Sequence, residues 1–499
     1  MQSKYSLVRI RATRRFFIPT ILATALALAL ATKSSRAADV YWDSNDVVLG
    51  AGAAPAGTWG TSNFWSTSAV GDVTTAAWVG GDVAIFSAGT DATSAYTVTL
   101  SGPQTIGGLT VEEGTPTISG AGSIALNNAA TPFAIAGTAN ISSVISGTTF
   151  GISKSGAGTL NLTGVNTFTG KTSVTGGILS IAADTGLGTA PGAAVADQLT
   201  LNNGTLKVTA TGQTLNVNRG VTLGASGGTF EFTDRPNTET FTIAGAITGT
   251  GALTLRSSGG VAPTGGGGGL GINLTNTANN YIGDTTITSG LVTYASNAVF
   301  GDAANKIILN GGGLLDNNLN IALARNIEVL AGGGTFRTYG GVTTANWSGA
   351  ITGSGFINRV DGGTLTLSGD LSGFSGTFNN QGGSTTLTGT AATIGGNWAT
   401  GGGTLTVNST ANQVIAGNLT GAGAFAKNAA GILTLSGSNS HTGATTITAG
   451  TIRQGVANAV SLGGALTVNG TSVFDLNAFN ASVASLGGCL LYTSDAADE

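Results

Sequence analysis

The chain of 499 residues contains 83 glycines but only 8 prolines, and charged residues make up 8% of it. A content of 41% hydrophobic residues is too high for a disordered chain, and neither the glycine period of collagen nor the heptads of a coiled coil occur. The composition therefore predicts many short β-strands separated by glycine and asparagine turns, in a chain longer than one compact core needs.

Residues 1–37 have the pattern of an export signal. Several arginines between residues 9 and 15 precede an uncharged, largely apolar stretch over residues 16–32, and Ser35-Arg36-Ala37 offers small residues for cleavage. The apolar stretch is short for a membrane-spanning helix and contains Pro19. The pair Arg14-Arg15 also fits a twin-arginine signal, so both export routes stay open.

Charge changes sharply after the predicted signal. Seven of the 19 basic residues precede Ala38 and no acidic residue does, which leaves 12 basic and 23 acidic residues in the rest of the chain. This acidic balance argues against nucleic acid or an anionic membrane as a partner.

Residues 38–118 are predicted to form an N-terminal cap. This segment holds four of the six tryptophans, Trp42, Trp59, Trp65 and Trp78. The end of a repeat array needs an atypical unit that covers the core, and tryptophan is usually mostly buried. The alternative interpretation is an exposed platform on which sugar rings stack, with Trp59 or Trp65 as the contact residue.

Residues 119–488 repeat loosely. The clearest unit is GAGTLNLTGVNTFTGKTSV over residues 156–174, residues 431–447 are a near copy, and partial copies begin near residues 274 and 362. Leu-Thr-Leu and Thr-Ile-Thr alternate with a period of two, so each strand has one apolar face and one hydroxyl-bearing face. Strands of about four residues at spacings of ~10–20 residues leave no room for crossover helices.

Stacking such strands as successive coils buries their apolar faces in one internal stripe, which predicts an all-β solenoid. At ~22 residues per coil, the repeat region would form roughly 17 coils. Tandem sandwich domains are the alternative, but the glycines of the repeat motif, Gly170, Gly283, Gly376 and Gly443, are too unequally spaced to mark equal domains.

The sequence offers little for catalysis. His441 is the only histidine, and without partners of its own type we interpret it as a structural turn residue, not a base or a metal ligand. The carboxylates that could serve a polysaccharide lyase or hydrolase form small local groups, interpreted as solvated surface: Glu112 with Glu113, Glu231 with Asp234 and Arg235, and Asp361 near Arg359. The glycine run 265–269 lacks the lysine and the helix of a phosphate-binding loop. No catalytic, cofactor-binding or metal-binding residue is predicted.

Residues 489–499 do not continue the repeat pattern. They contain the only cysteine, Cys489, and resemble the translation of a sequencing adapter. We expect this tail to be non-native, the natural chain to continue beyond Gly488, and the native protein to lack cysteine. Without disulfides, an exported chain relies on its core and its backbone ladders.

The unit at residues 156–174, with its copy at 431–447, resembles the passenger-associated transport repeat of the autotransporter-associated β-strand repeat proteins. The Trp-rich start through Gly108-Leu109-Thr110-Val111 also resembles the N-termini of such proteins. The resemblance implies a right-handed parallel β-helix with a cap, export across the inner membrane, and often a C-terminal translocator barrel. The alternating, aromatic-girdled strands that mark such a barrel are not found in this sequence.

Together these features predict an exported structural or adhesive protein without a cofactor and without enzymatic activity. The expected location is the cell surface, the outer membrane or the medium, and glycans or other cell surfaces are the expected partners. The alternatives are a carbohydrate-active β-helix enzyme, which would need converging carboxylates in a cleft, and a glycan-binding surface protein.

Overall fold

The computed structural model describes residues 37–233, 240–257, 271–317, 320–339, 344–460 and 463–488. The predicted signal up to Arg36, the glycine run 265–269, Asp234 with Arg235, and the tail that begins at Cys489 lie outside the described residues. In the part that is described, the chain forms strands β1 to β48 and two 3₁₀ turns, η1 (Asp184–Leu187) and η2 (Asn297–Phe300). No helix in these ranges has the length and apolarity needed to span a membrane.

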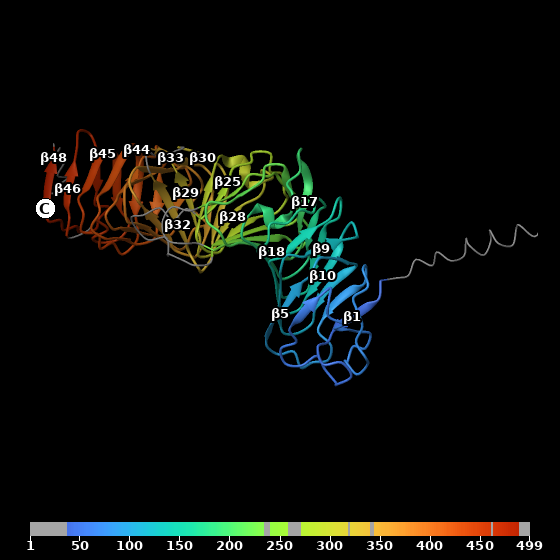
Figure 1. Cartoon of the computed structure of the whole chain (residues 1–499). Coiled ribbons are helices and arrows are strands. Elements are labelled where there is room, and N and C mark those ends of the chain that lie inside the picture. The colour runs from blue at the N-terminus through green and yellow to red at the C-terminus, as the bar shows by residue number, and fades with distance from the viewer. Residues whose placement is uncertain are drawn as a thin grey trace, which may run out of the picture. The chain divides into compact units, whose positions relative to one another are not determined.

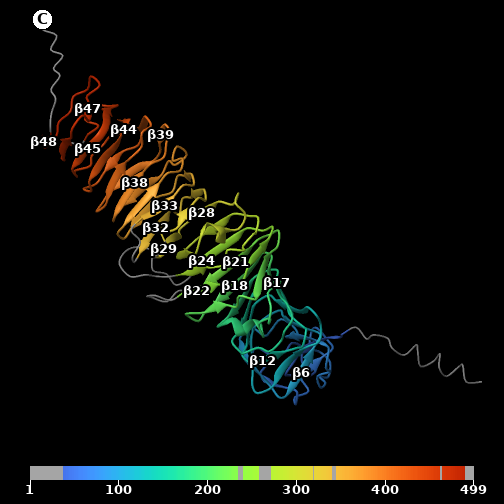
Figure 2. The ribbon, with the colours of Figure 1, turned by 90° about the horizontal axis from the view of Figure 1, so that it is seen from above.

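The strands of successive coils lie side by side in five sheets, A to E (Figures 1 and 2). Sheet A is built, in stacking order, from β3 (Trp65–Ser66), β1 (Asp39–Trp42), β4 (Val83–Phe86), β7 (Gly108–Val111), β10 (Thr131–Ile135), β13 (Ile152–Ser155), β15 (Thr172–Val174), β17 (Val195–Leu201), β20 (Arg219–Leu223) and β23 (Ile247–Gly249). Sheet C is short and contains β6 (Pro103–Ile106), β9 (Ser123–Leu126) and β12 (Val144–Ser146).

Sheet B runs beside sheet A and extends further along the solenoid. It consists of β2 (Gly57–Trp59), β5 (Ala95–Leu100), β8 (Thr115–Ser119), β11 (Thr138–Ile141), β14 (Thr159–Leu162), β16 (Ile178–Ile181), β18 (Gly204–Val208), β21 (Gly228–Phe232), β24 (Leu253–Ser257), β26 (Thr285–Ile287), β28 (Ile307–Leu309), β31 (Ile327–Val329) and β34 (Ile351–Gly353).

Two further sheets form the later coils. Sheet D contains β19 (Thr214–Leu215), β22 (Phe241–Ile243), β25 (Ile272–Leu274), β27 (Leu291–Tyr294), β29 (Gly313–Asn317), β32 (Gly334–Tyr339), β35 (Ile357–Val360), β37 (Thr377–Asn380), β40 (Asn397–Thr400) and β43 (Leu419–Thr420). Sheet E contains β30 (Ala322–Leu323), β33 (Thr344–Trp347), β36 (Thr364–Leu367), β38 (Ser384–Leu387), β41 (Thr404–Val407), β44 (Phe425–Leu435), β45 (Thr445–Gln454), β46 (Ala465–Val468) and β48 (Ser485–Gly488), with β39 (Thr393–Ile394), β42 (Gln413–Ile415) and β47 (Val473–Asp475) alongside.

Coil-to-coil pairing is parallel, and its register is regular. Thr364 pairs with Ser384 and Ser384 with Thr404, so these coils repeat every 20 residues. The exception among the strand pairs of the described ranges is β1 with β3, which run antiparallel at the N-terminal end. The whole forms a parallel β-solenoid of about 18 turns, which confirms the fold class predicted from the sequence.

The period-two pattern sets which side chains face inward. In β36, Leu365 and Leu367 are buried, whereas Thr364 and Thr366 stay partly exposed. The inward side chains of successive coils pack into one apolar core that runs through the stack. Burial of this continuous stripe is the main favourable term, because strands this short bury too little surface alone.

The tryptophans of the first coils are packed against one another. Trp42, Trp59 and Trp65 are buried, and the Trp65 ring centroid lies 5.1 Å from that of Trp42, 5.0 Å from Trp59 and 4.7 Å from Trp78. This cluster agrees with the predicted Trp-rich cap. Parallel pairing already begins within it, at β1 with β4 and β2 with β5, and the boundary at residue 118 stays a prediction.

The glycines of the repeat motif lie where two coils come closest. A Cβ atom on Gly376 would stand 1.9 Å from the carbonyl oxygen of Gly355 in the preceding coil, and one on Gly443 would stand 2.0 Å from the carbonyl oxygen of Gly423. No other residue fits these positions without moving the backbone, since real Cβ atoms essentially never approach that closely.

We therefore expect Gly376→Ala to destabilise the solenoid by about 2 kcal/mol or more. Gly192→Ala is the matched control, because a Cβ there meets no atom within 4 Å, and its effect should stay within about 0.5 kcal/mol. Urea-unfolding midpoints followed by circular dichroism measure both. Equal midpoints for the two variants would contradict the close approach.

Candidate functional site

His441 lies in the connection between β44 and β45, and its side chain points into the core. Its side chain is fully buried, its Nε2 lies 2.8 Å from the Thr445 hydroxyl, and its ring meets Phe425 edge-on. Burial lowers the pKa of the imidazole, which favours the neutral form. A neutral, enclosed ring bonded to one hydroxyl has no route to a substrate.

Two other coils place an aromatic residue where His441 lies. Tyr281 is also buried, and its hydroxyl bonds the Thr285 hydroxyl, four residues on, at 2.6 Å. Phe168 fills the third position and makes no such bond, so the buried Thr172 hydroxyl has no partner among the described residues. The histidine is therefore one of several side chains that fill an equivalent space in the core.

The acidic residues named from the sequence do not converge. Glu112 is exposed, whereas Glu113 accepts hydrogen bonds from the Ser87 hydroxyl at 3.2 Å and the Ala92 N–H at 3.3 Å. In the ranges that the structure describes, no group of three or more His, Cys, Asp or Glu side chains could hold a metal ion. This pair of glutamates forms no two-carboxylate site.

The charged partners of the other candidates come from neighbouring coils. Glu231 lies between Lys207, 2.8 Å away in β18, and Arg256 in β24. The Asp361 carboxylate accepts a hydrogen bond of 2.7 Å from the Nε of Arg337, one coil earlier. Arg359, which lies near Asp361 in the sequence, donates to backbone carbonyls instead. These carboxylates serve ion pairs between coils.

Trp59 and Trp65, the alternative candidates for stacking against sugar rings, do not expose an indole face to solvent. Trp59 is 0% exposed and Trp65 is 2% exposed, because both are enclosed by the aromatic cluster of the cap. Stacking a sugar ring requires an open indole face. Trp59 and Trp65 therefore pack the end of the core, and a glycan would have to bind elsewhere.

An asparagine that bridges three coils was missed in the sequence analysis. The Asn279 side chain accepts a hydrogen bond from the Ile247 N–H of the preceding coil at 2.8 Å and donates to the Val299 carbonyl of the following coil at 2.7 Å. Asn166 and Asn439 do the same in their own coils. The signal was present in the repeat, because this asparagine stands two residues before Phe168, Tyr281 and His441.

Buried cations were also missed. Lys154, Arg359 and Lys427 occupy corresponding inward positions of three coils, and all three are buried. The Lys154 ammonium donates to the carbonyls of Ser155, Gly156 and Gly176, at 3.1, 2.7 and 2.9 Å. Burial lowers the pKa of Lys154 to about 8 and that of Arg359 to about 10. The period-two pattern Ile152-Ser153-Lys154 places the lysine inward, which is the signal that identifies it.

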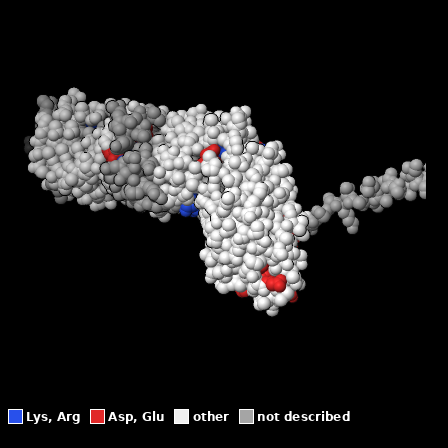
Figure 3. Space-filling view, viewed as in Figure 1, with Lys and Arg blue, Asp and Glu red and all other residues white. Residues whose placement is uncertain are grey.

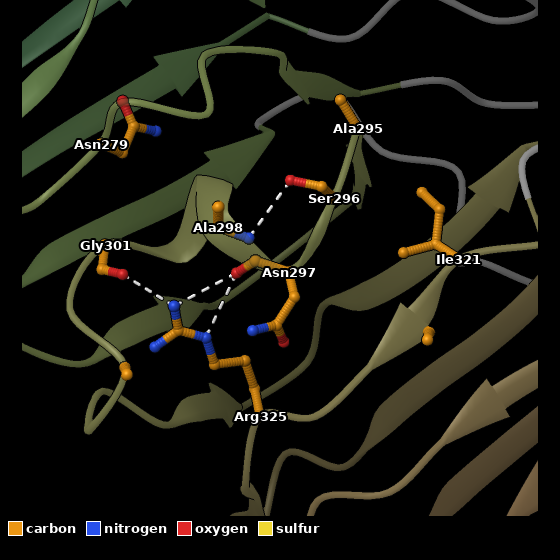
Figure 4. A pocket seen from close by; sticks show the side chains of 10 residues that line it. Asn279, Ala295, Ser296, Asn297, Ala298, Gly301, Ile321 and Arg325 are labelled. Atoms are coloured by element: carbon orange, nitrogen blue, oxygen red, sulfur yellow. Dashed lines mark hydrogen bonds between the residues drawn. The ribbon is translucent and has the colours of Figure 1, made fainter.

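A surface pocket of about 620 Å³ lies at the corner formed by η2, where Ser296, Asn297, Ile321 and Arg325 line it (Figure 4). The Arg325 guanidinium is turned to the backbone and donates to the Gly301 carbonyl at 2.7 Å and to the Asn297 carbonyl. The remaining polar side chains are the hydroxyl of Ser296 and the amides of Asn279 and Asn297, beside alanine side chains. Nothing in this arrangement is a nucleophile paired with a base.

Charged side chains are sparse on the face shown in Figure 3. The outward positions of the strands carry mainly threonine, serine and asparagine. Hydroxyl and amide groups both donate and accept hydrogen bonds, and they recur at the outward positions from coil to coil.

The family model described as the passenger-associated transport repeat matches residues 152–181 and 425–453. The chain contains two passenger-associated transport repeats. The two matched segments span β13 to β16 and most of β44 and β45, where the buried lysines Lys154 and Lys427 lie. No solved structure matches this repeat protein.

A curated relative is similar over most of the chain. The repeat protein is 32% identical over 375 residues, 73% of its length, to the Adhesin BmaC autotransporter of Brucella suis biovar 1 (strain 1330). The chain spans 9% of the length of that relative. A match over 375 residues must lie mostly within the coils of the solenoid.

His441 should make the stability of the solenoid depend on pH. Because its folded pKa is lowered, the unfolded state binds a proton that the folded state does not, and stability falls as the pH drops below about 6.5. We expect His441→Phe to remain folded, as Phe168 does in its coil, and to lose less stability between pH 7.5 and 5. Melting midpoints at the two pH values measure this. Parallel losses in both proteins would contradict a neutral buried imidazole.

The asparagine bridge should be costly to remove. Asn279→Ala leaves the Ile247 N–H and the Val299 carbonyl without partners, each at about 1–3 kcal/mol. Asn346→Ala is the control, because Asn346 is exposed on β33, and it should change the free energy of unfolding by no more than about 0.5 kcal/mol. Urea unfolding compares the two, and a similar midpoint shift in both would refute the bridge.

Proposed function

We propose that this chain is an adhesive passenger segment of an exported surface protein and has no catalytic activity. The observation that carries the proposal is its identity of 32% over 375 residues to an autotransporter adhesin. The two passenger-associated transport repeats and the parallel solenoid support the same role. Residues 1–37 would direct export, and the solenoid would be displayed at the cell surface, on the outer membrane or in the medium.

Glycans or the surfaces of other cells are the proposed partners. The outward side chains are mostly uncharged and able to hydrogen-bond, and the same chemistry recurs from coil to coil. Many weak contacts in a regular row give useful affinity through multivalency, which suits an adhesive surface.

The carboxylates named as candidates from the sequence do not favour a carbohydrate-active enzyme. Glu113 is held by a hydroxyl and a backbone N–H, and Glu231 and Asp361 are held by cations of neighbouring coils. General acid–base hydrolysis needs two carboxyl groups that face one substrate.

Deletion of the gene in its native bacterium tests the proposal. We expect antibodies against the full chain to label intact cells, and deletion to reduce adherence to host-cell monolayers severalfold, with restoration by the intact gene. Labelling that requires permeabilised cells, or unchanged adherence after deletion, would contradict the adhesive role. Release of reducing ends from polysaccharides by the purified chain would favour the enzyme instead.

A further inference from the structure

The outer face of sheet E carries two columns of side chains, here called the threonine ladder. Each of the strands β33, β36, β38 and β41 contributes one residue to each column, and the strand register places them in line. The first column consists of Thr344, Thr364, Ser384 and Thr404, and the second of Asn346, Thr366, Thr386 and Thr406.

The ladder is a regular two-dimensional array. Parallel strands lie ~4.8 Å apart, and residues two apart on one strand are separated by roughly 6.6 Å. The residues between the columns, among them Leu365 and Leu405, are buried in the core and fix the strands in place. The spacing of the ladder is therefore set by the backbone and does not depend on the side chains that it displays.

The hydroxyl groups of the ladder have no hydrogen-bond partner among the residues that the structure describes. These side chains are partly exposed. Some other outward columns contain side chains that pair with one another. On sheet B, Asn161 donates to Asn140 at 2.8 Å, and Lys207 pairs with Glu231; on sheet A, the hydroxyls of Thr222 and Thr248 lie 3.2 Å apart.

The ladder also carries no charged side chain over its four coils. The outer face of sheet B around Glu231 differs, because Lys207 and Arg256 form ion pairs with Glu231 there. A charged partner would lose water there without gaining a counter-charge, which disfavours binding. Threonine instead offers a hydroxyl that donates and accepts, next to a methyl group. These properties match a flat, neutral partner with hydroxyl groups at its edges and C–H groups on its faces.

We propose that the threonine ladder binds an extended, uncharged, β-linked polysaccharide that lies along the solenoid axis. One sugar ring of such a chain is close in length to the spacing of one coil, so successive rings meet successive strands. The two columns contact the two edges of the sugar ribbon. The proposal rests on the adhesive function proposed above and names its ligand class and its surface.

Co-sedimentation of the full chain with insoluble cellulose and chitin tests the proposal, with starch as the α-linked, non-extended control. Thr366→Val, Thr386→Val and Thr406→Val are combined in one variant, since valine keeps the β-branched shape and removes only the hydroxyl. Thr138→Val, Thr159→Val and Thr205→Val form the control variant on sheet B, where Ile178 interrupts the column between Thr159 and Thr205.

We expect the wild-type chain and the control variant to bind cellulose or chitin alike, and the ladder variant to bind about tenfold more weakly or worse. If the triple variant does not fold, Thr386→Lys tests the same surface. It places a charge in the centre of the ladder and should also weaken polysaccharide binding. Equal binding by the ladder and control variants overturns the proposal, and so does wild-type binding that is no stronger than to starch.

The outcome separates this proposal from the adhesive function on which it rests. A wild-type chain that adheres to host cells but sediments with neither polysaccharide overturns the ligand assigned to the ladder and leaves the adhesive role intact. Sedimentation with a polysaccharide that depends on the ladder, without adherence to host cells, supports polysaccharide binding by the ladder. It would contradict adhesion to host cells. A chain that binds none of these surfaces contradicts both.

Discussion

The pairing of every coil with the coil before and the coil after, at ~4.8 Å, governs the structure. A strand of four residues has no stable partner within its own coil, so its N–H and C=O groups must be satisfied by its neighbours in the stack. Once that spacing is fixed, any backbone that crosses the stack closely has no room for a Cβ. The motif glycines Gly376 and Gly443 meet this requirement, and their absence of a side chain follows from the position of the adjacent carbonyl.

At the corners of the coils, backbone N–H and C=O groups lack the hydrogen-bond partners that they have within the strands. Side chains supply the missing ones. Asn279 satisfies a donor in one neighbouring coil and an acceptor in the other, while Lys154 and Arg359 satisfy several turn carbonyls from inside the core. A buried cation surrounded by carbonyl oxygens avoids the cost of an unpaired charge in an apolar interior. These interior polar groups thus hold the corners of the coils together.

The inward side chains pack the core of the stack, so the outward side chains are available for binding. Packing does not restrict which residues stand at the outward positions, and the backbone sets the spacing between them. Adhesive binding over many coils is the role that such a surface suits, since each contact is weak and the number of contacts is large. The threonine ladder of sheet E combines two adjacent uncharged columns whose hydroxyls have no hydrogen-bond partner among the described residues, which is a property of register as well as of composition.

The sequence by itself determined the all-β solenoid and the inward leucines of units such as Leu365 and Leu367, because period-two alternation and glycine spacing are local properties of the chain. It did not determine that Glu231 meets Lys207 and Arg256, that Asp361 meets Arg337, or that His441 points into the core. The ion pairs join residues more than 20 apart, and coil lengths vary enough that only the folded register decides which residues become neighbours.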